Sequence, residues 1–184
     1  MCSILCTNKD IPDYDDVNKY LKFRGPDDTT IIEDESNNFT FLHNLLSMTG
    51  EVTPQPFVDD GIVCLYNGEI YNYKEFGYYK SDGYCIIDLY KEYGVDFVKK
   101  LDGEYAILLL DFNSDLILMA TDPFKTKPLF YSNCDGDFGC LLVSNRFGTQ
   151  RGKYDEVSYK RDSKNMTKIL KENDIPYFYW SHIP

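Results

Sequence analysis

The sequence has no long apolar run. No stretch of its 184 residues approaches the roughly 20 consecutive apolar residues that a membrane-spanning helix needs. The N-terminus also lacks the basic-then-apolar pattern of a secretory signal peptide, because it opens on Met1-Cys2-Ser3 with no basic residue before Lys9. These two absences predict that no membrane is a partner and that the protein is cytoplasmic.

Positive charge is scarce. The chain has 19 Lys and Arg against 30 Asp and Glu, which gives a formal net charge of -11. Direct binding of nucleic acid requires a clustered positive surface, so this balance argues against nucleic acid as a direct partner. Only one stretch is rich in basic residues, and we interpret it as a solvated surface of mixed charge. Its basic residues are Arg151, Lys153, Lys160, Arg161, Lys164, Lys168 and Lys171.

Residues that bind metals are few and badly spaced. The pairs Cys2/Cys6 and Cys134/Cys140 are spaced more widely than a Cys-x-x-Cys site, and the only two histidines are far from both pairs in the sequence. The sequence therefore predicts no metal site and no cofactor. In a cytoplasmic protein, buried free thiols are the expected state of the cysteines other than Cys2. These are Cys6, Cys64, Cys85, Cys134 and Cys140.

What the chain has in quantity is material for a packed core. Hydrophobic residues make up 43% of the sequence and charged residues 27%, with 16 Tyr and 12 Phe. These fractions are typical of a globular protein, and the length fits one domain with a short extension. Near Gly148 the sequence becomes polar and basic, and it ends in an aromatic cluster at 177–180. We expect a domain over residues 1–147 and an extension over 148–184 that docks back on it.

Short β-rich segments recur along the chain, bounded by Gly, Asn and Asp. A hairpin is expected where 113–115 joins two of them, and Asn67-Gly68 predicts a tight turn after a strand. Helical spacing over 82–93 predicts a helix capped by Ser81 or Asp82 and ended by Gly94. A short helix is expected near 71–76. The predicted strands are 39–46, 62–66, 105–112, 116–120, 129–131 and 140–143. The pattern favours an α+β layered domain built on antiparallel sheets.

Cys2 is a candidate nucleophile because of its position. If Met1 is removed, the Cys2 thiolate can attack an amide carbonyl while its own α-amine, with a reference pKa of about 7.7–8.0, relays the proton. A small second residue permits that removal, although for Cys2 taken alone a buried or chance cysteine is the better explanation. Whether Cys2 is a nucleophile therefore depends on the motifs elsewhere in the chain.

Several motifs follow Met1-Cys2-Ser3-Ile4 in one order. They are Arg24-Gly25-Pro26-Asp27-Asp28, Gln55-Pro56-Phe57, Tyr66-Asn67-Gly68-Glu69-Ile70-Tyr71-Asn72, Ser81-Asp82, Leu101-Asp102-Gly103-Glu104-Tyr105-Ala106, and Asp122-Pro123 with Lys127-Pro128-Leu129. Over about residues 1–146 this ordered set resembles the glutamine-hydrolysing domain of asparagine synthetases, a class II glutamine amidotransferase of the N-terminal-nucleophile superfamily.

The resemblance implies a four-layer αββα sandwich of two antiparallel sheets. It also implies that Cys2 attacks the side-chain amide of glutamine, forms a γ-glutamyl thioester and releases ammonia. The Asn67 side-chain amide and the Gly68 backbone N–H would form the oxyanion hole, where each donor is typically worth ~10²–10³ in rate. Glu69 and Asp82 would line the amino-acid end of the pocket, with Asp82 on the substrate ammonium. Ser47 lies in the stretch that, by the same resemblance, would contact glutamine mainly through its backbone.

One departure concerns the substrate. The family usually has an arginine that grips the glutamine α-carboxylate, and Leu45 stands at the matching position. Leucine cannot replace a charge-assisted fork. Three interpretations stay open: glutamine with another cation such as Arg146, a different amide that lacks the carboxylate, or an inactive interaction domain.

The matched region also carries Thr121 where the family has arginine, Lys125 where it has glycine and Asn145 where it has glutamate. No synthetase segment follows within the chain. We therefore expect a glutaminase subunit that supplies ammonia to a separate ATP-dependent synthetase.

Overall fold

The computed structural model describes residues 2–8, 13–48, 50–127 and 129. Its first sheet has the strand order β1-β3-β2, formed by β1 (Ser3–Thr7), β2 (Asp28–Asp34) and β3 (Phe39–Leu45). Both pairings are antiparallel. Helix α1 (Tyr14–Leu21) continues into a 3₁₀ turn, η1 (Lys22–Arg24). The side chain of Asp13 caps α1 by accepting from the N–H of Asp16 at 3.0 Å.

The second sheet has the order β4-β5-β6-β7 and is also antiparallel throughout. Its strands are β4 (Phe57–Asp59), β5 (Ile62–Ile70), β6 (Gly103–Asp111) and β7 (Leu116–Thr121). The predicted hairpin between β6 and β7 is confirmed, and the turn places Asp115 at φ 51°.

Helical turns cover the outer face of the second sheet. They are η2 (Tyr73–Glu75), η3 (Asp82–Tyr84), α2 (Cys85–Tyr93) and η4 (Gly94–Lys100). The predicted helix therefore exists and α2 ends at Gly94, which adopts a positive φ of 59°. None of the helices in the described ranges is long and apolar enough to cross a membrane.

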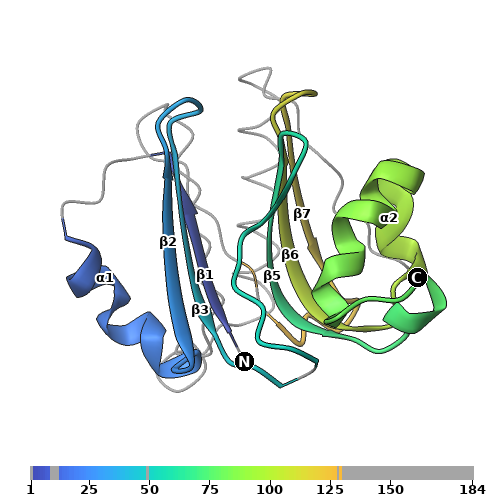
Figure 1. Ribbon diagram of the computed structural model, residues 1–184, viewed down its shortest axis with the longest axis horizontal. Helices are drawn as coiled ribbons and strands as arrows, with labels where there is room; N and C mark the ends of the chain where they lie inside the picture. The colour runs from blue at the N-terminus through green and yellow to red at the C-terminus, as the bar shows by residue number, and fades with distance from the viewer. Residues whose placement is uncertain (1, 9–12, 49, 128, 130–184) are drawn as a thin grey trace, which may run out of the picture.

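The layers run α1, first sheet, second sheet, α2, so the fold is the expected four-layer α+β sandwich (Figure 1). Alternation along the strands supplies a separate apolar layer to each interface. Leu5 and Leu42 pack with Leu21 of α1. A layer between the sheets, called here the inner layer, has as its buried members Ile4, Cys6, Phe41, Val63, Leu65, Leu108 and Leu110. The largest cluster lies between the second sheet and α2.

Two sequence predictions are wrong in detail. Asn67-Gly68 is not a turn, because β5 continues through it to Ile70. Neither Ser81 nor Asp82 caps the following helix with its side chain, because a 3₁₀ turn precedes α2 and the Asp82 carboxylate binds elsewhere. The predicted strands 129–131 and 140–143, and the extension 148–184, lie outside the described residues apart from Leu129.

Candidate functional site

Cys2 lies just before β1 and is buried, with its side chain held against the backbone that leaves β3. The Leu46 N–H donates to Cys2 Sγ at 3.4 Å, and Sγ lies 3.7 Å from the Leu46 carbonyl oxygen. The β1–β3 register pairs Ser3 with Asn44, so Cys2 follows on opposite Leu45. Cys2 shares the strand face of Ile4 and Cys6, so its thiol points into the inner layer.

The loop around Arg24–Asp28 supports both of these backbones. The Arg24 Nε–H donates to the Cys2 carbonyl oxygen at 3.5 Å. Asp27 fixes the chain after β3, because its N–H donates to the Leu45 carbonyl oxygen at 3.0 Å and its Oδ2 accepts from the Ser47 N–H at 2.8 Å. Gly25 passes so close to the Asn44 carbonyl oxygen that a side chain would overlap it. The Ser47 N–H is therefore bound to Asp27 within the protein.

The second half of β5 carries three further predicted site residues, Asn67, Gly68 and Glu69. Tyr105 directs its N–H and carbonyl oxygen toward Asp122, at 3.2 and 2.9 Å, so it does not exchange ladder bonds with its register partner Gly68. The N–H groups of Tyr66, Gly68 and Ile70 thus all point away from β6. Among the described strands, β4 pairs with β5 only opposite residues 62–64.

Side chains bind this edge of β5 where β4 has left it. Gln55 Oε1 accepts from the Tyr66 N–H at 2.6 Å, and Asp82 Oδ2 accepts from the Ile70 N–H at 2.9 Å. The Gly68 N–H lies between these two bonds on the same edge. Gly68 is required for close approach and not for a positive φ, because an added Cβ would lie 2.6 Å from the Tyr105 Cα.

Asn67 and Glu69 point to the opposite side from their neighbours, into the inner layer. They continue the face of Val63 and Leu65, and Asn67 is only 1% exposed. In Figure 1 the start of β1 and the end of β5 lie at the same end of the sandwich, and β1 packs against β5. We call this region, with Cys2, Leu45, Asn67 and Glu69, the site end of the inner layer.

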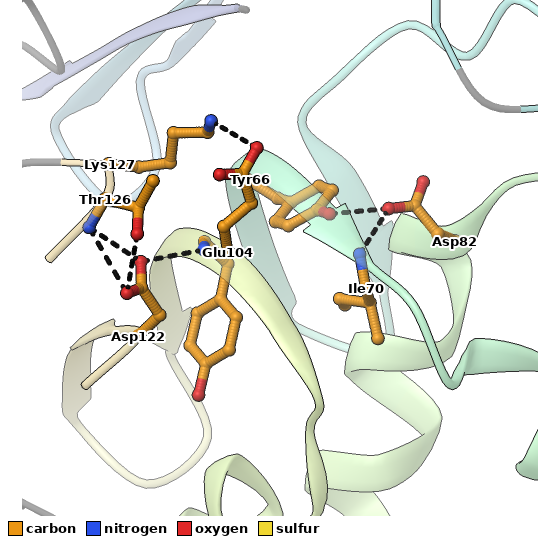
Figure 2. A network of polar contacts seen from close by, with 8 residues as sticks. Tyr66, Ile70, Asp82, Glu104, Asp122, Thr126 and Lys127 are labelled. Carbon is orange, nitrogen blue, oxygen red and sulfur yellow. Dashed lines mark hydrogen bonds and ion pairs between the residues drawn. The ribbon is translucent and has the colours of Figure 1, made fainter. Parts of the chain in front are cut away.

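Asp82 is buried at the entry to η3 and binds three donors. Its Oδ2 accepts from the Tyr66 hydroxyl at 2.6 Å and from the Ile70 N–H (Figure 2). Its Oδ1 accepts from the Ser81 hydroxyl at 3.1 Å. A carboxylate has about four acceptor positions, so Oδ1 keeps capacity for one more donor. This carboxylate is thus anchored by the protein and still able to bind an ammonium.

An ion pair that the sequence did not predict stands beside Glu69. Glu104 lies directly opposite Glu69 in the β5–β6 register and accepts from the buried Lys127 ammonium at 2.7 Å. Asp122 shapes the loop that carries Lys127 by accepting from the N–H and hydroxyl of Thr126 (Figure 2). The sequence motifs included Glu104, Asp122 and Lys127, but only the strand register reveals that Glu104 points inward.

Burial and charge both act on the thiol. Burial raises the pKa of Cys2 above its ordinary value, the Leu46 backbone bond opposes this, and the negative charges of Asp82 and Glu69 raise the pKa further. The structure therefore brings Cys2, Glu69 and Asp82 within electrostatic reach of one another. Burial also raises the pKa of Cys85, to about 12, and that of Cys64 still higher, so these thiols stay protonated at neutral pH.

Leu45 is a buried, apolar residue at the site end. It follows Phe41 and His43 on the face of β3 that lines the inner layer, next to Cys2. At the position where the resemblance implies a carboxylate-binding arginine, this chain therefore has no charged side chain. Arg146, the suggested substitute, lies outside the described residues.

Comparison with known proteins places this arrangement in a family. A family model described as a glutamine amidotransferase domain matches residues 1–176. A Methanocaldococcus jannaschii protein provisionally named a glutamine-hydrolyzing asparagine synthetase 1 is 33% identical over 201 aligned residues, covering 89% of this chain and 35% of that protein.

Two further relatives match shorter stretches. The Bacillus subtilis glutamine-hydrolyzing asparagine synthetase 2 is 37% identical over 61% of this chain and 16% of its own length. The amidase chry2 of Gibberella zeae is 34% identical over 61% of this chain and 19% of its own length. The chain thus spans about a third or less of these relatives. The fold, the ordered motifs and these matches together show that the chain belongs to the family of glutamine amidotransferase domains.

Proposed function

We propose that this chain hydrolyses the side-chain amide of glutamine through Cys2 and releases ammonia. The observation that carries the proposal is the site end itself. A buried thiol held by the Leu46 backbone lies at the same end of the sandwich as an edge of β5 that presents the Gly68 N–H beside the Asn67 amide. The names of the asparagine synthetase relatives supply the substrate.

In the first step the Cys2 sulfur attacks the side-chain carbonyl carbon of glutamine. The raised pKa of the Cys2 thiol keeps it protonated, so a base must remove its proton. The α-amine freed by removal of Met1 takes this proton, because its reference pKa of about 7.7–8.0 suits transfer near neutral pH. Cys2 thus supplies both the nucleophile, its thiol, and the base, its own α-amine.

The attack creates a negative oxygen on a tetrahedral carbon. The Gly68 N–H and the Asn67 side-chain amide donate to that oxygen, and fixed donors of this kind typically contribute ~10²–10³ each in rate. The C–N bond then breaks, and the α-ammonium returns its proton to the leaving nitrogen. Ammonia and a γ-glutamyl thioester result, and water hydrolyses the thioester to glutamate and the free thiol.

Recognition of the amino-acid end falls to carboxylates. Asp82 Oδ1 and Glu69 would bind the substrate ammonium, while Ser47, whose N–H is taken by Asp27, would contribute its carbonyl oxygen or hydroxyl. The ammonia would pass to a separate ATP-dependent synthetase; the names of the relatives, which join glutamine hydrolysis to asparagine synthesis, support only that a synthetase uses it. Raised ammonia release on adding an ATP-dependent synthetase from the same organism would support that pairing, and an unchanged rate would contradict it.

The decisive experiment compares the processed chain with its Cys2→Ser variant. We expect loss of Met1 by mass spectrometry, ammonia release from glutamine, and at least a ~10³-fold drop in kcat in the variant, because the hydroxyl is a far weaker nucleophile than the thiol. A glutamine-mimicking electrophile should label Cys2 and leave Cys64 and Cys85 unlabelled. A processed, folded chain that releases no ammonia and is not labelled is an inactive interaction domain.

A second candidate is hydrolysis of an amide without a free α-carboxylate. Leu45 favours it, because a buried apolar side chain stands next to Cys2, and one relative is named an amidase. Turnover of glutamine should be compared with that of glutamine esterified at the α-carboxylate. Equal or better turnover of free glutamine would exclude this candidate.

A further inference from the structure

One oxygen atom ties together both ends of the segment Asn67-Gly68-Glu69. Asp82 Oδ2 accepts from the Tyr66 hydroxyl at 2.6 Å and from the Ile70 N–H at 2.9 Å, so its two donors flank the segment on either side (Figure 2). Both bonds are buried. In this part of β5, the two bonds of Asp82, called here the clamp, stand in place of the strand bonds that β4 makes with residues 62–64.

The clamp controls the direction of one backbone group. The Gly68 N–H points to the same edge as the Tyr66 and Ile70 N–H groups, so any rotation of the strand at its two clamped ends re-aims it. On the other side, Gly68 packs against Tyr105 without room for a side chain. On the edge away from β6, the side-chain bonds of Gln55 and Asp82 hold the two ends of the segment.

We propose that Tyr66 is a positioning residue of the amide hydrolysis, acting through Asp82 to aim the Gly68 N–H at the oxygen of the tetrahedral intermediate. The inference rests on the proposed function and adds a residue to it. Tyr66 itself lies on the helix-facing side of β5, packed in the cluster with Cys85 and Ile86, and does not face the inner layer. Its hydroxyl therefore reaches the chemistry only through the carboxylate.

The Tyr66 hydroxyl of the clamp keeps its proton at neutral pH. Burial raises the pKa of Tyr66 well above its usual value, and the neighbouring Asp82 charge raises it further. The hydroxyl therefore remains a donor near neutral pH, where the α-amine would take the thiol proton. A charge-assisted O–H bond of this length is among the stronger hydrogen bonds of proteins.

The variant Tyr66→Phe tests this role because it removes the hydroxyl and keeps the ring in the cluster. Asp82 then keeps the Ile70 N–H and the Ser81 hydroxyl, so its carboxylate still has donors. Misplacing a catalytic group by about 1 Å costs up to ~10²-fold in rate. We expect kcat to fall by about tenfold and the rate of thioester formation to fall in parallel. The KM for glutamine should change less, because Tyr66 binds Asp82 Oδ2, whereas Oδ1, which would bind the substrate ammonium, keeps the Ser81 hydroxyl.

Tyr90→Phe is the matched control. The Tyr90 hydroxyl donates to Asp111 Oδ2 at 2.9 Å, another buried tyrosine–aspartate bond between α2 and the second sheet, but at the far end of β6. We expect a loss of stability similar to that of Tyr66→Phe, with kcat and KM unchanged. Rates are expressed per site titrated with the glutamine-mimicking electrophile, so that unfolded protein does not count.

Three outcomes separate the inference from the function on which it rests. Selective loss of kcat in Tyr66→Phe supports the inference. An unchanged kcat per titrated site, or an equal loss in both variants, overturns it while the proposed function stands. A wild-type chain that is processed and folded but inactive overturns both.

Discussion

The two halves of β5 are held in different ways. In the first half, residues 62–64 have strands on both sides. The side chains of Val63 and of Leu65, which follows, pack in the apolar part of the inner layer. The second half has β6 on one side, and on the other the side chains of Gln55 and Asp82. Where side chains replace a strand partner, each backbone N–H can bind a different acceptor, as those of Tyr66 and Ile70 do. In a continuous ladder, every N–H on that edge binds the neighbouring strand.

The inner layer shows the same division. Its apolar end contains aromatic rings: Phe39 stacks on Phe41 with the centroids 6.1 Å apart, and it is tilted against Phe112 at 5.8 Å. Its site end contains a thiol, an amide and the Glu104–Lys127 pair. We infer that the apolar end supplies stability and the site end supplies chemistry, so substitutions at the two ends should separate the two properties.

Phe41→Ala should cause the largest loss of stability. Phe41 is 1% exposed, and truncating a buried phenylalanine typically costs about 3–5 kcal/mol of unfolding free energy. Because Phe41 is remote from Cys2, kcat per folded site should stay within about twofold. Denaturant unfolding and ammonia release measure the two quantities. Phe23→Ala, at a side chain 77% exposed, should change stability by less than about 0.5 kcal/mol.

A drop in kcat comparable to the drop in stability for Phe41→Ala would show that the two ends of the inner layer are not independent. The Phe23 control separates that result from a general sensitivity of the fold to loss of an aromatic ring.

His43 should give stability a dependence on pH. It lies between the two ends, is 1% exposed, and within the described residues neither ring nitrogen has a hydrogen-bond partner. Burial lowers its pKa to about 4, with Asp28 opposing the shift. Between pH 6.5 and 4 the unfolded chain therefore binds the extra proton, so stability falls as pH falls through this window, by about 3 kcal/mol in total.

The measurement is denaturant unfolding at several pH values in that window. His43→Leu should have a flatter profile than the wild type, whatever its absolute stability, since the two differ only in this titrating group. Parallel profiles would mean that His43 is protonated alike in both states.

Lys127→Met should have the smallest effect of the three. The Lys127 side chain is 6% exposed and that of Glu104 is 32% exposed, so the pair lies between the surface and buried cases, and its loss should cost about 1–2 kcal/mol. Lys99→Met breaks the exposed i,i+3 pair with Asp96 and should cost less than about 0.5 kcal/mol. Thermal unfolding compares them, and equal losses would show that burial adds nothing to the inner-layer pair.

The sequence by itself determined the type of layered fold, most strands and the positions of the motifs. Alternation and turn residues are local signals, so the 39–45 strand and the β6–β7 hairpin were predictable. The position of Cys2 and the ordered motifs likewise indicated the family. The Asn67-Gly68 dipeptide misled, because the same two residues suit a hairpin turn and a strand that needs a glycine for close approach.

Only the tertiary structure decided what the polar side chains bind. Asp82 looked like a helix cap from its sequence neighbours, yet it binds Tyr66 and Ile70, which lie 16 and 12 residues away along the chain. The inward-facing Glu104–Lys127 pair and the buried His43 likewise depend on strand register. A sequence pattern reports the period of an element, but which face is covered, and where a neighbouring strand stops, is set by contacts between distant segments.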